Sequence, residues 1–142
     1  MRSKGFTLIE TVLALALAAF FAYAGAVSFS GFVPKFRLQT GVWKVRSALN
    51  EARFGAAWTG APRRVSFNAS GFALEAYDDA SDSWRLVRAE RLEGVEVSAN
   101  NDPAFYPEGT VANLATITVA NARGAYRITV AISGRVKVVK SE

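Results

Sequence analysis

A single carboxylate, that of Glu10, stands inside an apolar run that extends from Phe6 to Val33. Placing an ionised carboxylate in hydrocarbon costs roughly 2.5–3.5 kcal/mol on insertion scales, so an acid at such a position indicates a partner or a functional task. The natural partner is a buried amine, because pairing neutralises both charges. An acid that stays protonated or reaches the lipid headgroups is the alternative.

A second group of chemically active residues is basic and lies near the carboxy terminus: Arg123, Arg127, Arg135, Lys137 and Lys140. Arg135 and Lys137 are two residues apart and therefore share one face of an extended strand. Clustered cations are sufficient for sequence-independent contacts to phosphates. A solvated strand face on a basic protein would carry the same residues, and no aromatic residues that could stack on bases are obviously interleaved with them.

The composition excludes most catalytic chemistry. The 142 residues include neither cysteine nor histidine, which removes thiol nucleophiles, disulfides, imidazole bases and the usual zinc ligands. A Ser–Lys or paired-carboxylate enzyme would have only the presence of those residue types in its favour. The acids of the segment DDASDS, residues 78–83, lack the glycine and distal glutamate of an EF-hand loop, which favours a solvated turn over a calcium site. We expect no enzyme activity and no cofactor or metal.

The apolar run is long enough to cross a membrane as a helix. From residue 6 to residue 33 it comprises 28 residues without Lys or Arg, and about 20 are needed. Arg2 and Lys4 precede it, so the positive charge predicts a cytoplasmic amino terminus and a carboxy-terminal domain on the far side. A secretory signal cleaved at one of its A-x-A patterns is the alternative.

The next segment predicts an amphipathic helix that continues the apolar one. Apolar residues recur there at spacings of three and four, at Leu38, Val42, Val45, Leu49, Ala52 and Ala56. This spacing is typical of a helix with one buried face. Gly60 and Pro62 end the pattern, so the sequence predicts one helix from Phe6 to Gly60 with a kink or local unwinding near Pro34.

Beyond residue 62, alternating apolar residues predict strands joined by short turns. RRVSFN and FALEAY form a first hairpin, and WRLVRAERL and VEVSAN follow. The last strands are the clearest, with the turn NARG between inward-facing residues at Ile117, Val119, Tyr126, Ile128, Val130 and Ile132, then Val136 and Val138. We expect an antiparallel sheet with one buried face, and an irregular surface loop at residues 100–114.

The segment KGFTLIE, which begins at Lys4, resembles the class III leader of type IV pilins and type II secretion pseudopilins. In that family a prepilin peptidase cuts after the glycine and methylates the new amino terminus. The resemblance implies processing at Gly5 and Phe6, which leaves 137 of the 142 residues. It also implies an assembly contact between Glu10 of one subunit and the methylated Phe6 amine of a neighbour.

The tail GTVANLATITVANARGAYRITVAISGRVKV, Gly109 to Val138, resembles the end of GspH and FimT-like minor pseudopilins. Residues 63–107 match nothing specific to the family. The resemblance implies a pilin-like α+β fold, with a long amino-terminal helix packed on a carboxy-terminal antiparallel β-sheet head. The expected parts are a leader (1–5), a transmembrane and assembly helix (6–34), an amphipathic helix (35–61) and the head (62–142).

The function implied by the resemblance is structural. Such a subunit would help to initiate or cap the periplasmic pseudopilus of a type II protein secretion system, anchored in the inner membrane by one pass with its head in the periplasm. Its partners would be other pilins or pseudopilins, the prepilin peptidase and, indirectly, the assembly platform and its ATPase. The alternative is a FimT-like minor type IV pilin that binds DNA through Arg135, Lys137, Arg127 and Arg123. The amino-terminal residues fit both.

Overall fold

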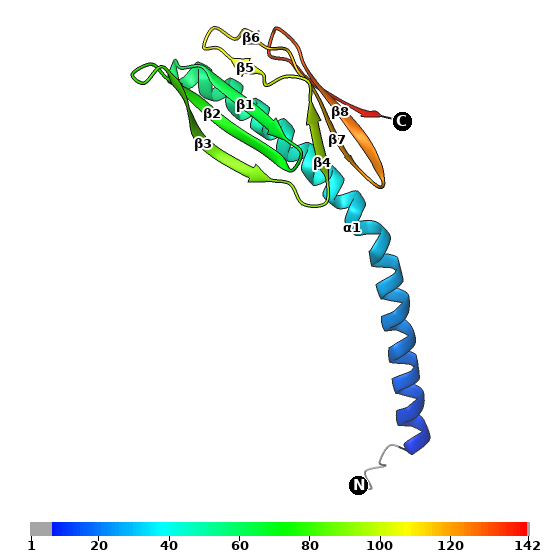
Figure 1. Ribbon diagram of the computed structural model, residues 1–142. Coiled ribbons are helices and arrows are strands. Elements are labelled where there is room, and N and C mark those ends of the chain that lie inside the picture. Colours follow the sequence, from blue (N-terminus) through cyan, green and yellow to red (C-terminus); the bar gives the residue numbers. More distant parts are fainter. Residues whose placement is uncertain (1–6, 142) are drawn as a thin grey trace. The chain divides into compact units, whose positions relative to one another are not determined.

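The computed structural model describes residues 7–141, except for the side chains of residues 27–30. Its elements are the helix α1 (Leu8–Thr59) and the strands β1 (Arg63–Asn68), β2 (Gly71–Asp78), β3 (Ser83–Arg91), β4 (Glu96–Ala99), β5 (Ala104–Phe105), β6 (Val111–Ala112), β7 (Thr116–Asn121), β8 (Gly124–Val130) and β9 (Val136–Ser141) (Figure 1). The chain divides into two compact units, residues 1–33 and residues 34–142, which are described separately.

The first unit contains the apolar section of α1. Large apolar side chains along it are exposed, among them Leu8, Ile9, Leu13, Leu15, Phe20 and Phe21. By length and composition α1 is long and apolar enough to cross a membrane, and none of its most apolar stretch is buried. Because no described part of this unit buries these side chains, we expect them to contact lipid or another protein.

In the second unit, α1 contributes one face to the core, as the sequence predicts. The six residues of the predicted apolar stripe are all buried, and Ala48 is buried with them. The helix is continuous through Pro34, so it is not unwound there, and the expected kink stays a prediction. It ends at Thr59, and Gly60 follows with a φ of +68°, the left-handed conformation that commonly terminates helices.

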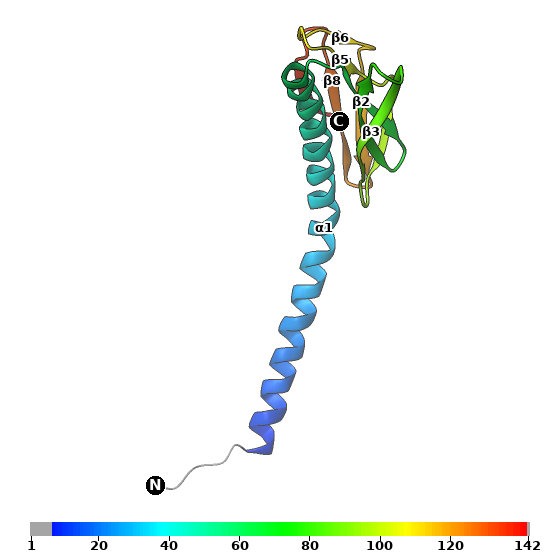
Figure 2. The same ribbon diagram turned by 90° about the vertical axis from the view of Figure 1, so that its left-hand side faces the viewer.

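The strands form an antiparallel head in two sheets. One sheet has the order β3-β2-β1-β5-β6 and the other β4-β7-β8-β9. In Figure 2 both sheets lie on the same side of the head section of α1. Side chains from the helix and both sheets form one core, which includes Leu49, Val65, Phe72, Ile117 and Ile128. The expected antiparallel head is thus confirmed, and the structure adds its division into two sheets.

The residues of the last strands that were predicted to share one inward face do so with one exception. Ile117 of β7 lies opposite Ile128 of β8, and Ile128 lies opposite Val138 of β9. Ile132, which was expected to face inward, is exposed. β8 ends at Val130, and the turn that follows contains Gly134 in a left-handed conformation, so the alternation of the strand does not extend to Ile132.

Residues 100–114 are not the surface loop that the sequence predicts. They contain β5 and β6, and β5 pairs with β1 through Phe105 and Arg63. The side chains of Pro103, Phe105 and Val111 are buried. Each strand has two residues, which is too short to show a period of two, so this part of the core leaves no pattern in the sequence.

Strand β3 is the edge of the larger sheet, and most of its residues are exposed. Near the carboxy-terminal end of β3, the backbone of β2 lies very close to that of β3. A Cβ on Gly71 would lie 2.1 Å from the carbonyl oxygen of Glu90. Two ion pairs fasten β3 to α1. The Lys44 Nζ lies 2.8 Å from Glu90 Oε1, and Arg88 Nη2 lies 2.8 Å from Glu51 Oε2.

Candidate functional site

The carboxylate of Glu10 lies on the first turn of α1. The Glu10 N–H donates to the Thr7 carbonyl oxygen at 3.1 Å, so Thr7 precedes the helix and Glu10 occupies its amino-terminal turn. A negative charge is favoured there by the helix dipole. The side chain of Glu10 is exposed, and within residues 7–141 it forms no ion pair. A partner amine would have to come from beyond the described residues or from another chain.

Gly5 and Phe6, the predicted processing residues, lie outside the described residues. Their role as a peptidase site and as the methylated amine stays a prediction.

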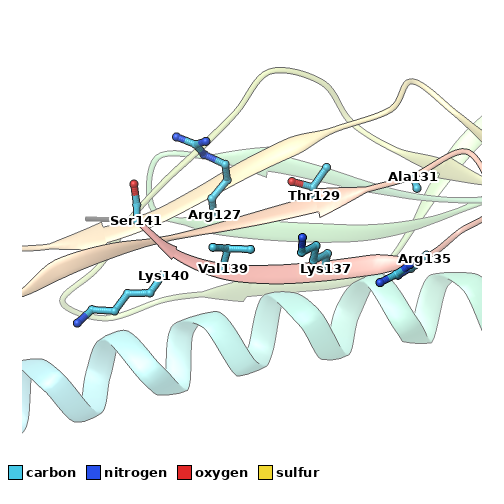
Figure 3. Close-up of a pocket in the computed structure, with 8 residues that line it drawn as sticks. All are labelled: Arg127, Thr129, Ala131, Arg135, Lys137, Val139, Lys140 and Ser141. Atoms are coloured by element: carbon cyan, nitrogen blue, oxygen red, sulfur yellow. The ribbon is translucent and has the colours of Figure 1, made fainter.

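Three of the four predicted DNA-binding residues lie together on the smaller sheet. Arg127 of β8, Arg135 in the turn before β9, and Lys137 of β9 line a hollow of about 770 Å³ with Thr129, Ala131, Val139, Lys140 and Ser141. Cross-strand pairing explains this grouping, because Arg127 lies opposite Val139 and Thr129 lies opposite Lys137. Directly opposed residues share a face. Figure 3 shows the side chains of Arg127, Thr129 and Lys137 on one face of the two strands. We call this site the cationic hollow.

All the charged residues described in the lining of the cationic hollow are cations. No carboxylate is among its residues, and its cations take no part in the ion pairs of residues 7–141. The hydroxyl groups of Thr129 and Ser141 add hydrogen-bond donors. Exposed guanidinium and ammonium groups beside hydroxyls are suited to contacts with phosphate or carboxylate oxygens.

Two residues differ from the predicted set. Arg123 does not line the cationic hollow, because it lies in the turn between β7 and β8, where its N–H donates to Asn121 Oδ1 at 2.9 Å. Lys140 does line it, although it pairs with Tyr126 and so belongs to the opposite face of β9, as Figure 3 shows. The position of Lys140 in the last strand could have indicated this, because a long side chain on an edge strand can reach around the edge of the sheet.

The acids between β2 and β3 serve the turn itself. Asp78 Oδ1 accepts the N–H of Ala80 at 3.1 Å, and the Tyr77 hydroxyl donates to Asp82 Oδ1. Within residues 7–141 no group of three or more metal-type side chains could hold an ion. The hydrogen bond to Asp82 is the main cause that raises the pKa of Tyr77 above its usual 10.0, with smaller contributions from desolvation and from the nearby acids.

Replacing Asp82 by alanine is expected to lower the pKa of Tyr77 toward 10.0. Folding raises this pKa, so the contact stabilises the head fully below pH 10 and is lost as the pH rises through the raised value. An absorbance titration of the tyrosinates, compared between the wild-type chain and the variant, measures the shift. Asp79→Ala is the control, because Asp79 acts on Tyr77 through charge alone, and its effect should be smaller. Identical titrations in all three chains would contradict the assignment.

Comparison with known proteins agrees with the description of the amino-terminal segment and with that of the fold. Residues 1–22 match the model of the prokaryotic N-terminal methylation motif. The fold is similar to that of the minor pseudopilin EpsH from the type 2 secretion system of Vibrio cholerae, with a TM-score of 0.63 and 12% sequence identity over 73% of this chain and 97% of that one. This chain is pilin-like. No curated protein sequence matches it at a significant level.

The pilin-like fold is that of structural subunits, and it bears out the expectation of a non-catalytic protein. The helix α1 and the methylation motif together indicate a pilin-type anchor that crosses the membrane once. The expected α+β class, with a long amino-terminal helix and antiparallel sheets, is confirmed by the similarity to EpsH. The methylation motif and the pilin-like fold imply that the chain associates with other pilins in a filament.

Proposed function

We propose that this pilin-like chain is a minor pseudopilin that helps to initiate or cap the periplasmic pseudopilus of a type II protein secretion system. The observation that carries the proposal is the exposed carboxylate of Glu10 on the first turn of an exposed apolar helix, inside a prepilin methylation motif. The head adds support, because its fold is similar to that of a minor pseudopilin from such a system.

In this proposal a prepilin peptidase removes residues 1–5 and methylates the amine of Phe6. Residues 6–34 form the inner-membrane and assembly helix, residues 35–61 continue into the head, and residues 62–142 form the periplasmic head. Arg2 and Lys4 keep the amino terminus in the cytoplasm until it is processed. Glu10 of an incoming subunit then pairs with the Phe6 amine of its neighbour, and the platform and its ATPase supply the work of extraction.

Deletion of the gene tests which machine the subunit serves. Proteins in the culture medium are quantified by mass spectrometry in the deletion strain and in a strain complemented with the wild-type chain. Loss of a defined set of secreted proteins, restored by the wild-type chain, is the expected result. An unchanged set of secreted proteins would overturn the type II secretion role and direct attention to a type IV pilus.

A second function, DNA binding by a FimT-like type IV pilin, is favoured by the cationic hollow. Arg127 is separated from Arg135 and Lys137 by the end of β8 and the turn that follows it, yet the three line one hollow whose described residues include no acid. Such a site suits the phosphates of a nucleic acid bound without sequence preference.

Reversing two charges of the hollow is expected to weaken DNA binding by at least about tenfold. The variant is Arg135→Glu with Lys137→Glu, and binding to duplex DNA is measured over a series of salt concentrations with the detergent-solubilised full chain. Each lost phosphate contact should reduce the slope of log affinity against log salt by about 0.9. The matched control is Arg46→Glu with Arg85→Glu, which makes the same charge change at exposed positions outside the hollow. Equal losses in both variants would show a general charge effect and exclude the site.

A further inference from the structure

Three segments that are far apart in the sequence meet at one end of the head. They are the first turn of α1 in the second unit, which starts at Pro34, the connection between β3 and β4, and the turn between β7 and β8 (Figure 1). The Asn121 side chain joins them, because its Nδ2 donates to the Pro34 carbonyl oxygen at 2.7 Å and to the Gly94 carbonyl oxygen at 3.4 Å. The Arg37 Cδ lies 2.7 Å from the position that a Cβ on Gly94 would occupy. These contacts hold the three segments together as one surface.

This surface is basic. Four exposed cations lie on it: Lys35 and Arg37 of α1, Arg91 of β3, and Arg123 in the turn between β7 and β8. Arg37 and Arg91 line the same hollow of about 230 Å³. None of the four forms an ion pair with any residue that the structure describes, and none lines the cationic hollow. We call these four residues the basic end of the head.

Acids at the basic end are fewer than cations. Glu93 lies in the connection between β3 and β4, and Glu96 is the first residue of β4, so four cations face two carboxylates. The turn at the opposite end of β2 and β3 carries acids and no cation, at Asp78, Asp79 and Asp82. The two ends of this hairpin therefore differ in charge, and the positive end is the one beside the start of the second unit.

The basic end follows the apolar section of α1 directly along the chain. From Leu8 to Val33 the helix extends for about 39 Å at ~1.5 Å per residue, and a bilayer with its headgroup regions is about 40–45 Å thick. Lys35 and Arg37 are the first cations after this section. In a chain anchored by this helix they lie at the level of the lipid phosphates, where the β3–β4 connection and the β7–β8 turn add Arg91 and Arg123.

We propose that the basic end of the head binds the phosphate groups of anionic phospholipids in the bilayer that anchors α1. Guanidinium and ammonium groups form charge-assisted hydrogen bonds with phosphate oxygens, and each cation near an anionic lipid surface shifts the binding equilibrium about fivefold. Docking fixes the orientation of the head before assembly, and the contacts are lost when the subunit leaves the bilayer. The inference needs the membrane anchor but no particular machine, so it goes beyond the proposed function.

A single fluorophore at the basic end tests the docking. The chain contains no cysteine, so Ala122→Cys, at an exposed position next to Arg123, provides one site for a thiol-reactive fluorophore. The labelled full-length chain is reconstituted in nanodiscs of phosphatidylcholine alone or of an equal mixture with phosphatidylglycerol. Both kinds of disc contain a lipid with a nitroxide on its headgroup, which quenches fluorophores at that level. Ala80→Cys, exposed in the turn between β2 and β3, carries the control label.

We expect stronger quenching at position 122 in the discs with phosphatidylglycerol than in those without it, and little quenching at position 80 in either. Arg91→Gln with Arg123→Gln should lower the ratio of docked to undocked heads at least about tenfold. The matched variant, Arg46→Gln with Arg85→Gln, removes two exposed cations outside the basic end and should dock like the wild-type chain. Salt at about 1 M, where the Debye length is about 3 Å, should weaken the docking of the wild-type chain.

Equal quenching at position 122 in both kinds of disc, or wild-type quenching in the chain with Arg91→Gln and Arg123→Gln, would overturn the inference. Quenching that inorganic phosphate abolishes at constant ionic strength would assign the basic end to free phosphate rather than to a lipid surface, and would overturn it as well. None of these outcomes affects the gene-deletion test, so a failure of this inference is distinguishable from a failure of the proposed function.

Discussion

Replacement of Glu10 by alanine is expected to reduce incorporation of the chain into filaments by at least about a hundredfold. Breaking a buried ion pair by removing one partner costs roughly 3–5 kcal/mol, and each 1.4 kcal/mol changes an equilibrium tenfold. Membrane insertion should improve, because the variant no longer places a carboxylate in hydrocarbon. Processing at Gly5 should continue, because the cleaved bond lies five residues earlier in the chain than Glu10.

The measurement compares the amounts of variant and wild-type chain in sheared filaments and in membranes, with the mass of the amino-terminal peptide as the readout of processing. Glu10→Gln, which keeps the shape and removes the charge, should be reduced as well. Thr11→Ala changes the adjacent exposed residue and should assemble normally. A processed Glu10→Ala chain that enters filaments at the wild-type level would refute the role of the carboxylate.

Replacement of Leu49 by alanine is expected to lower the free energy of unfolding of the head by roughly 3–5 kcal/mol. The Leu49 side chain is fully buried in the core that α1 shares with both sheets. Its truncation removes apolar contacts and leaves a cavity between the helix and the strands. Because small domains are stable by about 5–15 kcal/mol, this one change removes a large share of the stability.

Urea unfolding of the detergent-solubilised chain, followed by near-ultraviolet circular dichroism, measures this loss. Leu86→Ala is the control, because Leu86 is exposed on β3 and its truncation should change the free energy by less than about 0.5 kcal/mol. A Leu49→Ala chain with the wild-type unfolding midpoint would contradict the description of the core.

The helix was the most predictable part of the chain. A period of 3.6 residues, continued over five turns from Leu38 to Ala56, has few other interpretations, and all the residues it selects are buried. Gly60 and Pro62 fixed its end to within a residue of Thr59. The strands were recognisable for the same reason, because RRVSFN, FALEAY and TITVAN alternate over six residues or more.

Only the pairing of strands joined by a short turn could be predicted, as for β1 with β2 and β7 with β8. Alternation shows that a segment is extended, but it does not show that β4 joins β7 or that β1 joins β5. These pairings depend on how the helix and the two sheets pack in the core. β5 and β6 escaped notice because two residues carry no period, although Phe105 is among the most buried side chains.

The candidate sites show the same limit. Arg127, Arg135 and Lys137 all belong to the predicted set, and the three line one hollow although Arg135 lies in the turn before β9. The register of β8 with β9 explains why Arg127 shares a face with Lys137. Arg123 lies in the turn between β7 and β8 and does not line the hollow, which its spacing from the other cations could not show. Glu10 was found because a charge in an apolar run is rare.

The fastening of β3 has a consequence for how the head moves. Among residues 7–141, the ion pairs Lys44–Glu90, Arg88–Glu51 and Arg88–Glu90 all involve this strand, and exposed pairs weaken as salt screens them. Few buried side chains hold β3 in place, so its amides are the ones whose hydrogen exchange depends on ionic strength. The edge of the larger sheet would therefore loosen as the ionic strength of the medium rises and tighten as it falls, while the core stays closed.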